Sequence, residues 1–227
     1  MSKAYPDIPF DLPEVTAAQK QRARRIYKRL AERYPDARCA LDYRNPHELL
    51  IATILSAQST DLGVNKATPA LFAAFPTPAD YAKSTPAQVE KHIKSIGLYR
   101  NKAKAIVESM KRLRDEYGGE VPRTMDELLT LRGVARKTAN VVLGNAFNIN
   151  MGVVVDTHIE RLAKRFDLAP QNATVAQVER HLMALFPRDN WTMLAHLLIA
   201  HGRAVCKARG GGCSTDPICR AYCNNAT

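Results

Sequence analysis

Apolar residues recur at helical spacing along most of the chain, and no segment alternates between apolar and polar residues as a strand does. Val153 to Val155 is the longest run of β-branched residues, and it is too short to predict a sheet. The apolar segments follow helix-start signals, in which Thr or Asn precedes Gln, Glu or Pro. The pattern therefore predicts an all-α fold, with helices over 16–34, 47–58, 61–75, 85–97, 101–117, 124–130, 136–147, 157–165, 174–186 and 191–205.

A glycine-bearing turn at Leu131–Ala135 separates two of these predicted helices. The helix after the turn begins at Arg136 and carries Lys137 in its first turn. Backbone N–H groups at a helix start bind phosphate well, and glycine at position 133 lets the backbone approach closely. We therefore expect a phosphate-binding turn with a lysine at its edge.

Composition and charge narrow the function classes. The 227 residues could form one large domain or two small ones, and 46% hydrophobic residues are ample for a core. No apolar run approaches the ~20 residues needed to span a membrane, and the first residues lack an apolar signal core. A soluble protein of the cytoplasm or nucleoid is expected. The formal charge of +11, with basic clusters at 20–29, 91–114 and 203–209, favours a polyanionic partner.

Four of the five cysteines lie close together after residue 205. In a chain without an export signal, such a cluster favours a metal site over disulfides. The four candidate ligands are Cys206, Cys213, Cys219 and Cys223.

Several motifs, taken in order, resemble the endonuclease III branch of the helix-hairpin-helix DNA glycosylases with a Gly/Pro-rich loop and Asp. They are Ile54–Asp61, Ile96–Tyr99, Arg136–Val142 and Val155–His158, followed by the cysteine group. The resemblance covers nearly the whole chain after Thr16. It implies a two-lobed fold: a six-helix barrel over 40–150 with its hairpin near 128–147, and an iron–sulfur lobe from 1–39 plus 151–227. A DNA cleft is expected between the lobes.

The resemblance also implies a mechanism. Lys137 would attack the sugar C1′ of a flipped nucleotide, release the base through a Schiff base, and cleave the strand by β-elimination. Asp156 would accept a proton and stabilise the cationic sugar, and it is also a good N-cap for the helix 157–165. Gln58 and Leu98 would fill the vacated space in the duplex. The alternatives are that Gln58 caps a helix and that Leu98 is a core residue after a C-cap glycine.

The chain departs from the family pattern in two places. In the hairpin, Arg132 replaces a proline and Ala135 replaces a second glycine; if position 135 needs a positive φ, alanine costs ~1 kcal/mol. Arg132 would then compensate with a cation near the phosphate that Gly133, Ala135 and Arg136 bind.

The second departure is in the cysteine spacing. The family has two and then five residues after its second cysteine, whereas this chain has five and then three, with Asp216 at the third position. The resemblance implies a [4Fe-4S] cluster, and zinc or an empty site are the alternatives. Lys207 and Arg209, between the first two ligands, would contact phosphate.

These features predict a bifunctional DNA glycosylase and apurinic/apyrimidinic lyase of base excision repair that removes oxidised pyrimidines. Its partner would be duplex DNA with damaged pyrimidines or abasic sites, and it would act as a monomer. The alternative is a DNA-binding paralogue of the same fold with weak or lost catalysis, or with altered base specificity.

Overall fold

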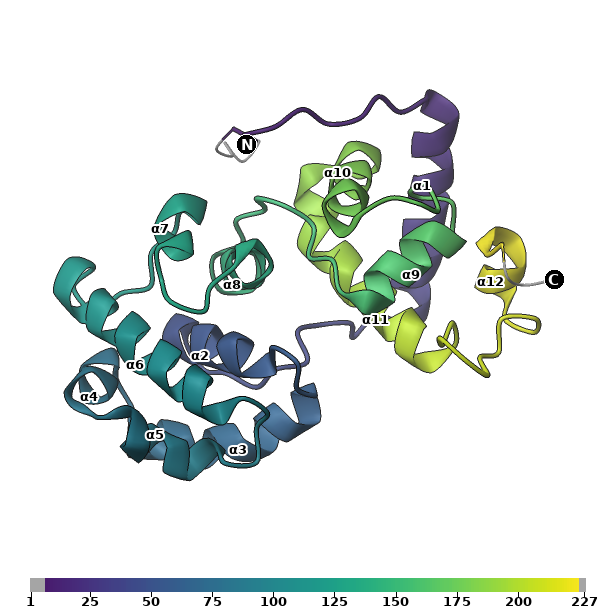
Figure 1. Ribbon diagram of the computed structural model, residues 1–227. Helices are drawn as coiled ribbons and strands as arrows, with labels where there is room; N and C mark the ends of the chain where they lie inside the picture. The colour runs from purple at the N-terminus through teal and green to yellow at the C-terminus, as the bar shows by residue number, and fades with distance from the viewer. Residues whose placement is uncertain (1–6, 225–227) are drawn as a thin grey trace. The chain divides into compact units, whose positions relative to one another are not determined.

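The computed structural model describes residues 7–224, and every regular element in that range is helical (Figure 1). The all-α prediction is confirmed. None of these helices combines the length and the apolar character that a membrane span needs. Residues 1–6 and 225–227 lie outside the described residues.

The chain divides into two compact units. One unit is Cys39–Ile149, and the other combines Met1–Arg38 with Asn150–Thr227. Each unit has its own helices and its own buried apolar side chains. That each unit is a domain of its own, as the sequence indicates, stays a prediction.

In the unit Cys39–Ile149, the long helix α6 packs against α2, α4 and α5, and α8 packs against α2 and α7 (Figure 1). The helices of this unit are α2 (Pro46–Ser56), α3 (Asp61–Ala74), α4 (Pro78–Lys83), α5 (Pro86–Ile93), α6 (Tyr99–Glu116), α7 (Met125–Leu129) and α8 (Arg136–Phe147). Helix α2 is buried along nearly its whole length, because seven of its side chains in a row from Leu49 to Leu55 are buried. Helix α8 packs against this buried helix.

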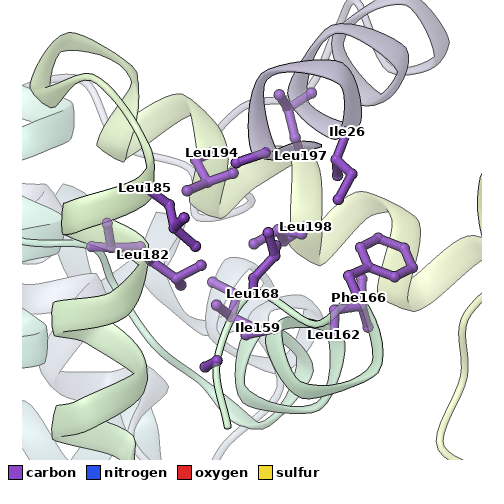
Figure 2. Packing of buried hydrophobic residues seen from close by; sticks show 14 of the residues in the cluster. Ile26, Ile159, Leu162, Phe166, Leu168, Leu182, Leu185, Leu194, Leu197 and Leu198 are labelled. Carbon is purple, nitrogen blue, oxygen red and sulfur yellow. The ribbon is translucent and has the colours of Figure 1, made fainter. Parts of the chain in front are cut away.

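The second unit is built around the packing of α11 against α1 and α9. Its helices are α1 (Ala17–Arg33), α9 (Thr157–Arg165), α10 (Val175–Leu185), the 3₁₀ helix η1 (Arg188–Asn190), α11 (Trp191–Ala204) and α12 (Pro217–Tyr222). Figure 2 shows Ile26, Leu162 and Leu198 converging from three of these helices, and all three side chains are fully buried. This apolar cluster also contains the four C-terminal cysteines. The core thus includes side chains of the segment that carries the cysteines.

The predicted helix starts are largely confirmed. Thr16 and Gln19 exchange hydrogen bonds at the start of α1, and Thr174 and Gln177 do the same at the start of α10. The Asn45 side chain accepts from the Glu48 amide at 3.0 Å and begins α2. Such caps are recognisable in the sequence because both partners lie within one helical turn.

The prediction is wrong between residues 93 and 99. Helix α5 ends at Ile93, not near Gly97, and α6 begins at Tyr99, not at Asn101. Leu98 is the N-cap of α6 with φ of 58°, a left-handed conformation that a side-chain pattern does not reveal. The six-residue helices α4 and α12 are further elements that the apolar pattern does not predict.

Candidate functional site

The turn before α8 is closed by one backbone hydrogen bond, from the Val134 amide to the Leu131 carbonyl at 3.2 Å. Gly133 has φ of 80°, and a Cβ added there would lie 3.1 Å from the Cβ of Ala105 on α6. Two separate features favour glycine at position 133: the left-handed backbone and the close packing against Ala105. Any other residue would cost roughly 1 kcal/mol for the conformation alone. The turn itself thus packs against α6, directly before the start of α8.

Ala135 does not carry the strain that its departure from the family pattern led us to expect. It is the N-cap of α8 with φ of −100° and ψ of 171°, an extended conformation that any residue adopts. The condition for that cost, a positive φ at position 135, is therefore not met. Since alanine has no capping group, no side-chain cap closes the first turn of α8. An exposed helix N-terminus without such a cap is suited to binding an anion.

Arg132 is held by the helix beside it. Its guanidinium donates to the Glu108 carboxylate at 2.7 Å, and its carbonyl accepts from the Ser109 hydroxyl at 2.9 Å. Both partners belong to α6. The cation thus stays next to the turn, but part of its charge is already compensated by Glu108, which weakens the compensating role expected for it.

Lys137 is an exposed residue in the first turn of α8, and Arg136 beside it is half-buried. The rest of α8 is anchored through Ala139, Val142 and Leu143, which are fully buried. The lysine stem therefore projects from a rigid base next to the Gly133 turn. This arrangement matches the pattern expected from the sequence.

Asp156 belongs to the other unit and begins α9. Its Oδ1 accepts from the Ile159 amide at 2.8 Å, so the expected N-cap contact is present. The side chain is only partly buried, and a carboxylate has further acceptor capacity after one such bond. The capping bond fixes the orientation of the carboxylate. Capping and proton transfer are therefore compatible at this residue.

Gln58 and Leu98 share an unusual backbone conformation. Their φ angles are 55° and 58°, in the left-handed region that costs a residue other than glycine roughly 1–2 kcal/mol. Leu98 is 57% exposed and is not a core residue, and Ala57, not Gln58, is the C-cap of α2. The alternative that Leu98 is a core residue is therefore wrong, and Gln58 is the left-handed residue that directly follows the C-cap of α2. Strained backbone that presents exposed side chains is typical of functional sites.

The four C-terminal cysteines converge in the structure. All four are buried, and their sulfur atoms lie within 4.8 Å of one another. Burial and the neighbouring sulfurs raise the pKa of the Cys219 thiol, and burial raises that of Cys213. Four close thiols cannot all ionise without a compensating cation, so this arrangement is suited to a metal cluster, which would hold them as thiolates.

Asp216 explains how the altered spacing still brings the sulfurs together. Its Oδ1 accepts from the amides of Ile218 at 2.9 Å and Cys219 at 3.0 Å, so it is the N-cap of α12. Its Oδ2 lies 3.1 Å from the Arg33 guanidinium of α1. The short helix then places Cys219 and Cys223, four residues apart, on one face. The residue at the expected third ligand position thus starts the helix that contains Cys219 and ends at its C-cap, Cys223.

Polar groups that sequence analysis did not single out surround the sulfurs. Arg165 donates to the Cys206 sulfur at 3.3 Å, and the His201 Nε2 lies 3.3 Å from the Cys219 sulfur. Burial lowers the pKa of His201 to about 4, so the ring is neutral near pH 7. Its Nδ1 lies 2.9 Å from the Tyr34 hydroxyl. A thiolate can only accept, so His201 donates to a deprotonated Cys219. No sequence spacing signals these partners, because they come from distant helices.

The loop between the first two cysteines is tightly folded. A Cβ on Gly211 would collide with the Val205 carbonyl, and the Gly212 amide donates to that carbonyl at 3.2 Å. Lys207 and Arg209 are exposed on this loop, and the Lys207 carbonyl accepts from Arg165 at 2.9 Å. The loop therefore presents two cations from a defined backbone.

Comparison with known proteins agrees with this geometry. Residues 51–188 match the HhH-GPD superfamily of base excision DNA repair proteins. The endonuclease III of Synechocystis sp. is 48% identical over 206 residues, which cover 89% of this chain and 94% of that relative. The endonuclease III of Bacillus subtilis is 44% identical, with 84% of this chain and 86% of that relative covered.

The chain belongs to the HhH-GPD superfamily, in its endonuclease III branch. A solved structure of a trapped endonuclease III–DNA covalent intermediate is 44% identical, with a TM-score of 0.86 over 94% of this chain and 98% of that chain. A non-covalent endonuclease III–DNA complex is equally similar, with a TM-score of 0.86 and 97% of its chain covered. As a member of this branch, the protein is a DNA glycosylase of base excision repair with lyase activity at abasic sites, and DNA is its partner.

The Gly133 turn yields a prediction with a built-in control. Gly133→Ala and Gly119→Ala both place alanine at a positive φ, but only at position 133 does the new Cβ meet a neighbour within 4 Å. Both variants should lose roughly 1 kcal/mol of unfolding free energy for the backbone conformation, and Gly133→Ala should lose more because its Cβ crowds Ala105. Only Gly133→Ala should also weaken duplex binding, by about 10-fold, because the amides of the turn would shift away from the phosphate that we expect them to bind. Urea denaturation and fluorescence anisotropy measure the two effects, and equal affinities of the two variants would contradict this assignment.

Proposed function

We propose that this endonuclease III family member removes oxidised pyrimidines from duplex DNA and cleaves the strand, with Lys137 as nucleophile. The protein would act as a monomer on DNA of the nucleoid. The observation that carries the proposal is the exposed lysine at the start of α8, beside a turn whose helix N-terminus has no side-chain cap. A strand phosphate bound at that terminus would bring the neighbouring nucleotide to the amine.

The proposed reaction needs no reactant besides the DNA, the lysine amine and water. The unprotonated Nζ of Lys137 forms a bond to C1′, and the glycosidic bond breaks as the base leaves with its electron pair and takes up a proton. Opening of the sugar ring gives a Schiff base. Loss of a proton from C2′ then expels the 3′ phosphate by β-elimination, and water releases the lysine. A lysine suits this sequence because only an amine forms the iminium that acidifies C2′.

Asp156 supports this sequence as a proton acceptor and as a negative charge for the oxocarbenium-like sugar. Its N-cap bond to Ile159 holds the carboxylate in one orientation. In this proposal the cap supplies positioning and the remaining acceptor capacity supplies the chemistry.

Gln58 and Leu98 would occupy the space that a flipped nucleotide leaves in the duplex. Both side chains are exposed, and both project from left-handed backbone positions. An amide can replace lost base-pair hydrogen bonds, and an apolar side chain can replace lost stacking. The two residue types therefore match the two interactions that extrusion removes.

A [4Fe-4S] cluster fits the four C-terminal cysteines, because Cys-thiolate fourfold ligation is its usual form. Cys206, Cys213, Cys219 and Cys223 would hold it, with Arg165 and His201 donating to two of the sulfurs. Its role would be to fix α12 and the loop that presents Lys207 and Arg209 to DNA phosphate. Zinc is the alternative metal for four cysteines.

Borohydride trapping tests the nucleophile and the substrate together. The wild-type protein should form a covalent adduct with duplexes that contain thymine glycol or an abasic site, because borohydride reduces the Schiff base. Lys137→Gln should form none, whereas Lys104→Gln, which removes an exposed lysine from α6, should trap normally. If the wild-type protein binds DNA normally but is not trapped, the alternative function holds, namely a DNA-binding paralogue with weak or lost catalysis. Trapping on 8-oxoguanine duplex instead of thymine glycol would contradict the pyrimidine specificity.

Asp156→Asn separates capping from chemistry. Asparagine is as good an N-cap as aspartate, so the unfolding free energy should change by less than about 0.5 kcal/mol. The rate of base release should fall by roughly 100- to 10,000-fold, because the amide cannot accept a proton. Asp156→Ala, as the comparison, should lose the cap as well, at about 1 kcal/mol. An Asp156→Asn variant with the wild-type rate would show that Asp156 only caps α9.

Absorbance identifies the metal. The purified protein should absorb at about 400 nm, as Cys-ligated iron–sulfur clusters do and zinc thiolates do not. Cys219→Ala should remove this band, and Cys39→Ala should retain it, since Cys39 lies in the other unit. A colourless protein with stoichiometric zinc would exclude the iron–sulfur assignment.

A further inference from the structure

Lys102 is a buried lysine on α6 with an unusual set of partners. Its side chain is only 6% exposed, and no carboxylate pairs with it among residues 7–224. Instead, its Nζ donates to the Leu55 carbonyl at 2.9 Å, the Ala57 carbonyl at 2.6 Å and the Ser59 hydroxyl at 3.0 Å. An ammonium has three N–H donors, so all of them are used. Burial lowers the pKa of this lysine, and these contacts offset part of the desolvation that causes the shift.

The three acceptors lie at the end of α2 and in the turn that follows it. The last carbonyls of a helix have no partners within the helix, and a cation there meets the negative end of the helix dipole. Ala57 and Ser59 are the two neighbours of Gln58 in the chain. Lys102 therefore holds the backbone on both sides of the left-handed residue Gln58.

The same residue also fixes the second left-handed position. The Lys102 amide donates to the Leu98 carbonyl at 3.1 Å in the first turn of α6. The two turns lie side by side, because a Cβ added to Gly97 would lie 3.7 Å from the Gln58 carbonyl oxygen. It would also lie 3.9 Å from the Ser59 hydroxyl oxygen. Lys102 thus connects the two turns that present Gln58 and Leu98, which are distant in the sequence.

We propose that Lys102 is a positioning residue that locks the Gln58 turn and the Leu98 turn into one rigid pair. The inference rests on the proposed insertion of Gln58 and Leu98 into the duplex. Inserting two side chains costs less entropy when their backbones are already ordered in the free protein. Lys102 touches no reacting atom, and its ammonium is committed to three oxygens, so its role is distinct from that of Lys137.

The test measures binding to a duplex that contains a tetrahydrofuran abasic analogue, which requires no chemistry. Lys102→Met keeps most of the side-chain volume and removes the three contacts. Its dissociation constant for this duplex should rise by about 10-fold, relative to undamaged duplex. Lys111→Met, which removes an exposed lysine from the same helix, should change this ratio by less than about 2-fold, because its loss is only electrostatic.

A double-mutant cycle separates positioning from general structural damage. In a Gln58→Ala, Leu98→Ala background, Lys102→Met should change the dissociation constant by less than about 2-fold, since the groups that it positions are already gone. A merely structural role would give the same loss in both backgrounds. Equal losses, or no loss in the wild-type background, would overturn the positioning role of Lys102. A Gln58→Ala, Leu98→Ala protein that binds like the wild type would overturn it as well.

The outcomes also separate this inference from the proposed function. If the wild-type protein is not trapped by borohydride but the cycle shows coupling, catalysis fails and the positioning role stands. If trapping succeeds and the cycle shows no coupling, the positioning role alone fails. Should Lys102→Met not fold, Ser59→Ala removes one of the three contacts from the acceptor side. The Ser59→Ala variant should then show the same coupling to the Gln58→Ala, Leu98→Ala background, and its amide hydrogen exchange over residues 55–62 should be faster. A Ser59→Ala variant with unchanged exchange and no coupling would overturn the proposal.

Discussion

Helix ends are the constraint on which the candidate sites depend, because the first N–H groups and the last carbonyls of a helix lack partners within it. The start of α8 follows Ala135, which cannot cap it, and so this end is suited to binding an anion. The start of α9 is capped by Asp156, and the end of α2 by the Lys102 ammonium. The residues proposed for chemistry and insertion therefore lie where backbone groups must find a partner outside the helix.

Local chemistry explains what the sequence could predict. The N-caps at Thr16, Asn45 and Thr174 involve partners three residues away, so their signal is contained in a short motif. The Gly133 turn was equally predictable, because glycine at a break between two helical patterns indicates a positive φ. The all-α fold and the place of Lys137 at a helix start follow from such signals. Family resemblance added the roles of these residues, which the pattern alone does not contain.

Contacts between distant segments explain what the sequence could not predict. Leu98 follows a glycine, and the sequence predicts that this glycine is the C-cap of the preceding helix. However, α5 ends at Ile93, and Leu98 is the N-cap of the next helix. In the sequence Lys102 is one of several lysines in the basic cluster 91–114, and its role is hidden because its acceptors lie at the end of α2. The φ of Ala135 is hidden from the sequence for a related reason, because it depends on how α8 begins. A substitution in a motif has a defined cost only when the local backbone is known.

The cysteine group shows how a ligand set can move along a chain and still converge. A carboxylate at position 216 cannot act as the third sulfur ligand, and here both of its oxygens are already engaged by amides and by Arg33. Those same bonds begin α12, and helical spacing then directs Cys219 and Cys223 to the side that faces Cys206. The absence of a cysteine at position 216 and the presence of Cys219 and Cys223 as ligands are thus linked, because Asp216 begins the helix that positions both. Spacing between cysteines therefore tests ligation poorly, because a short capped helix changes which spacings are compatible with one site.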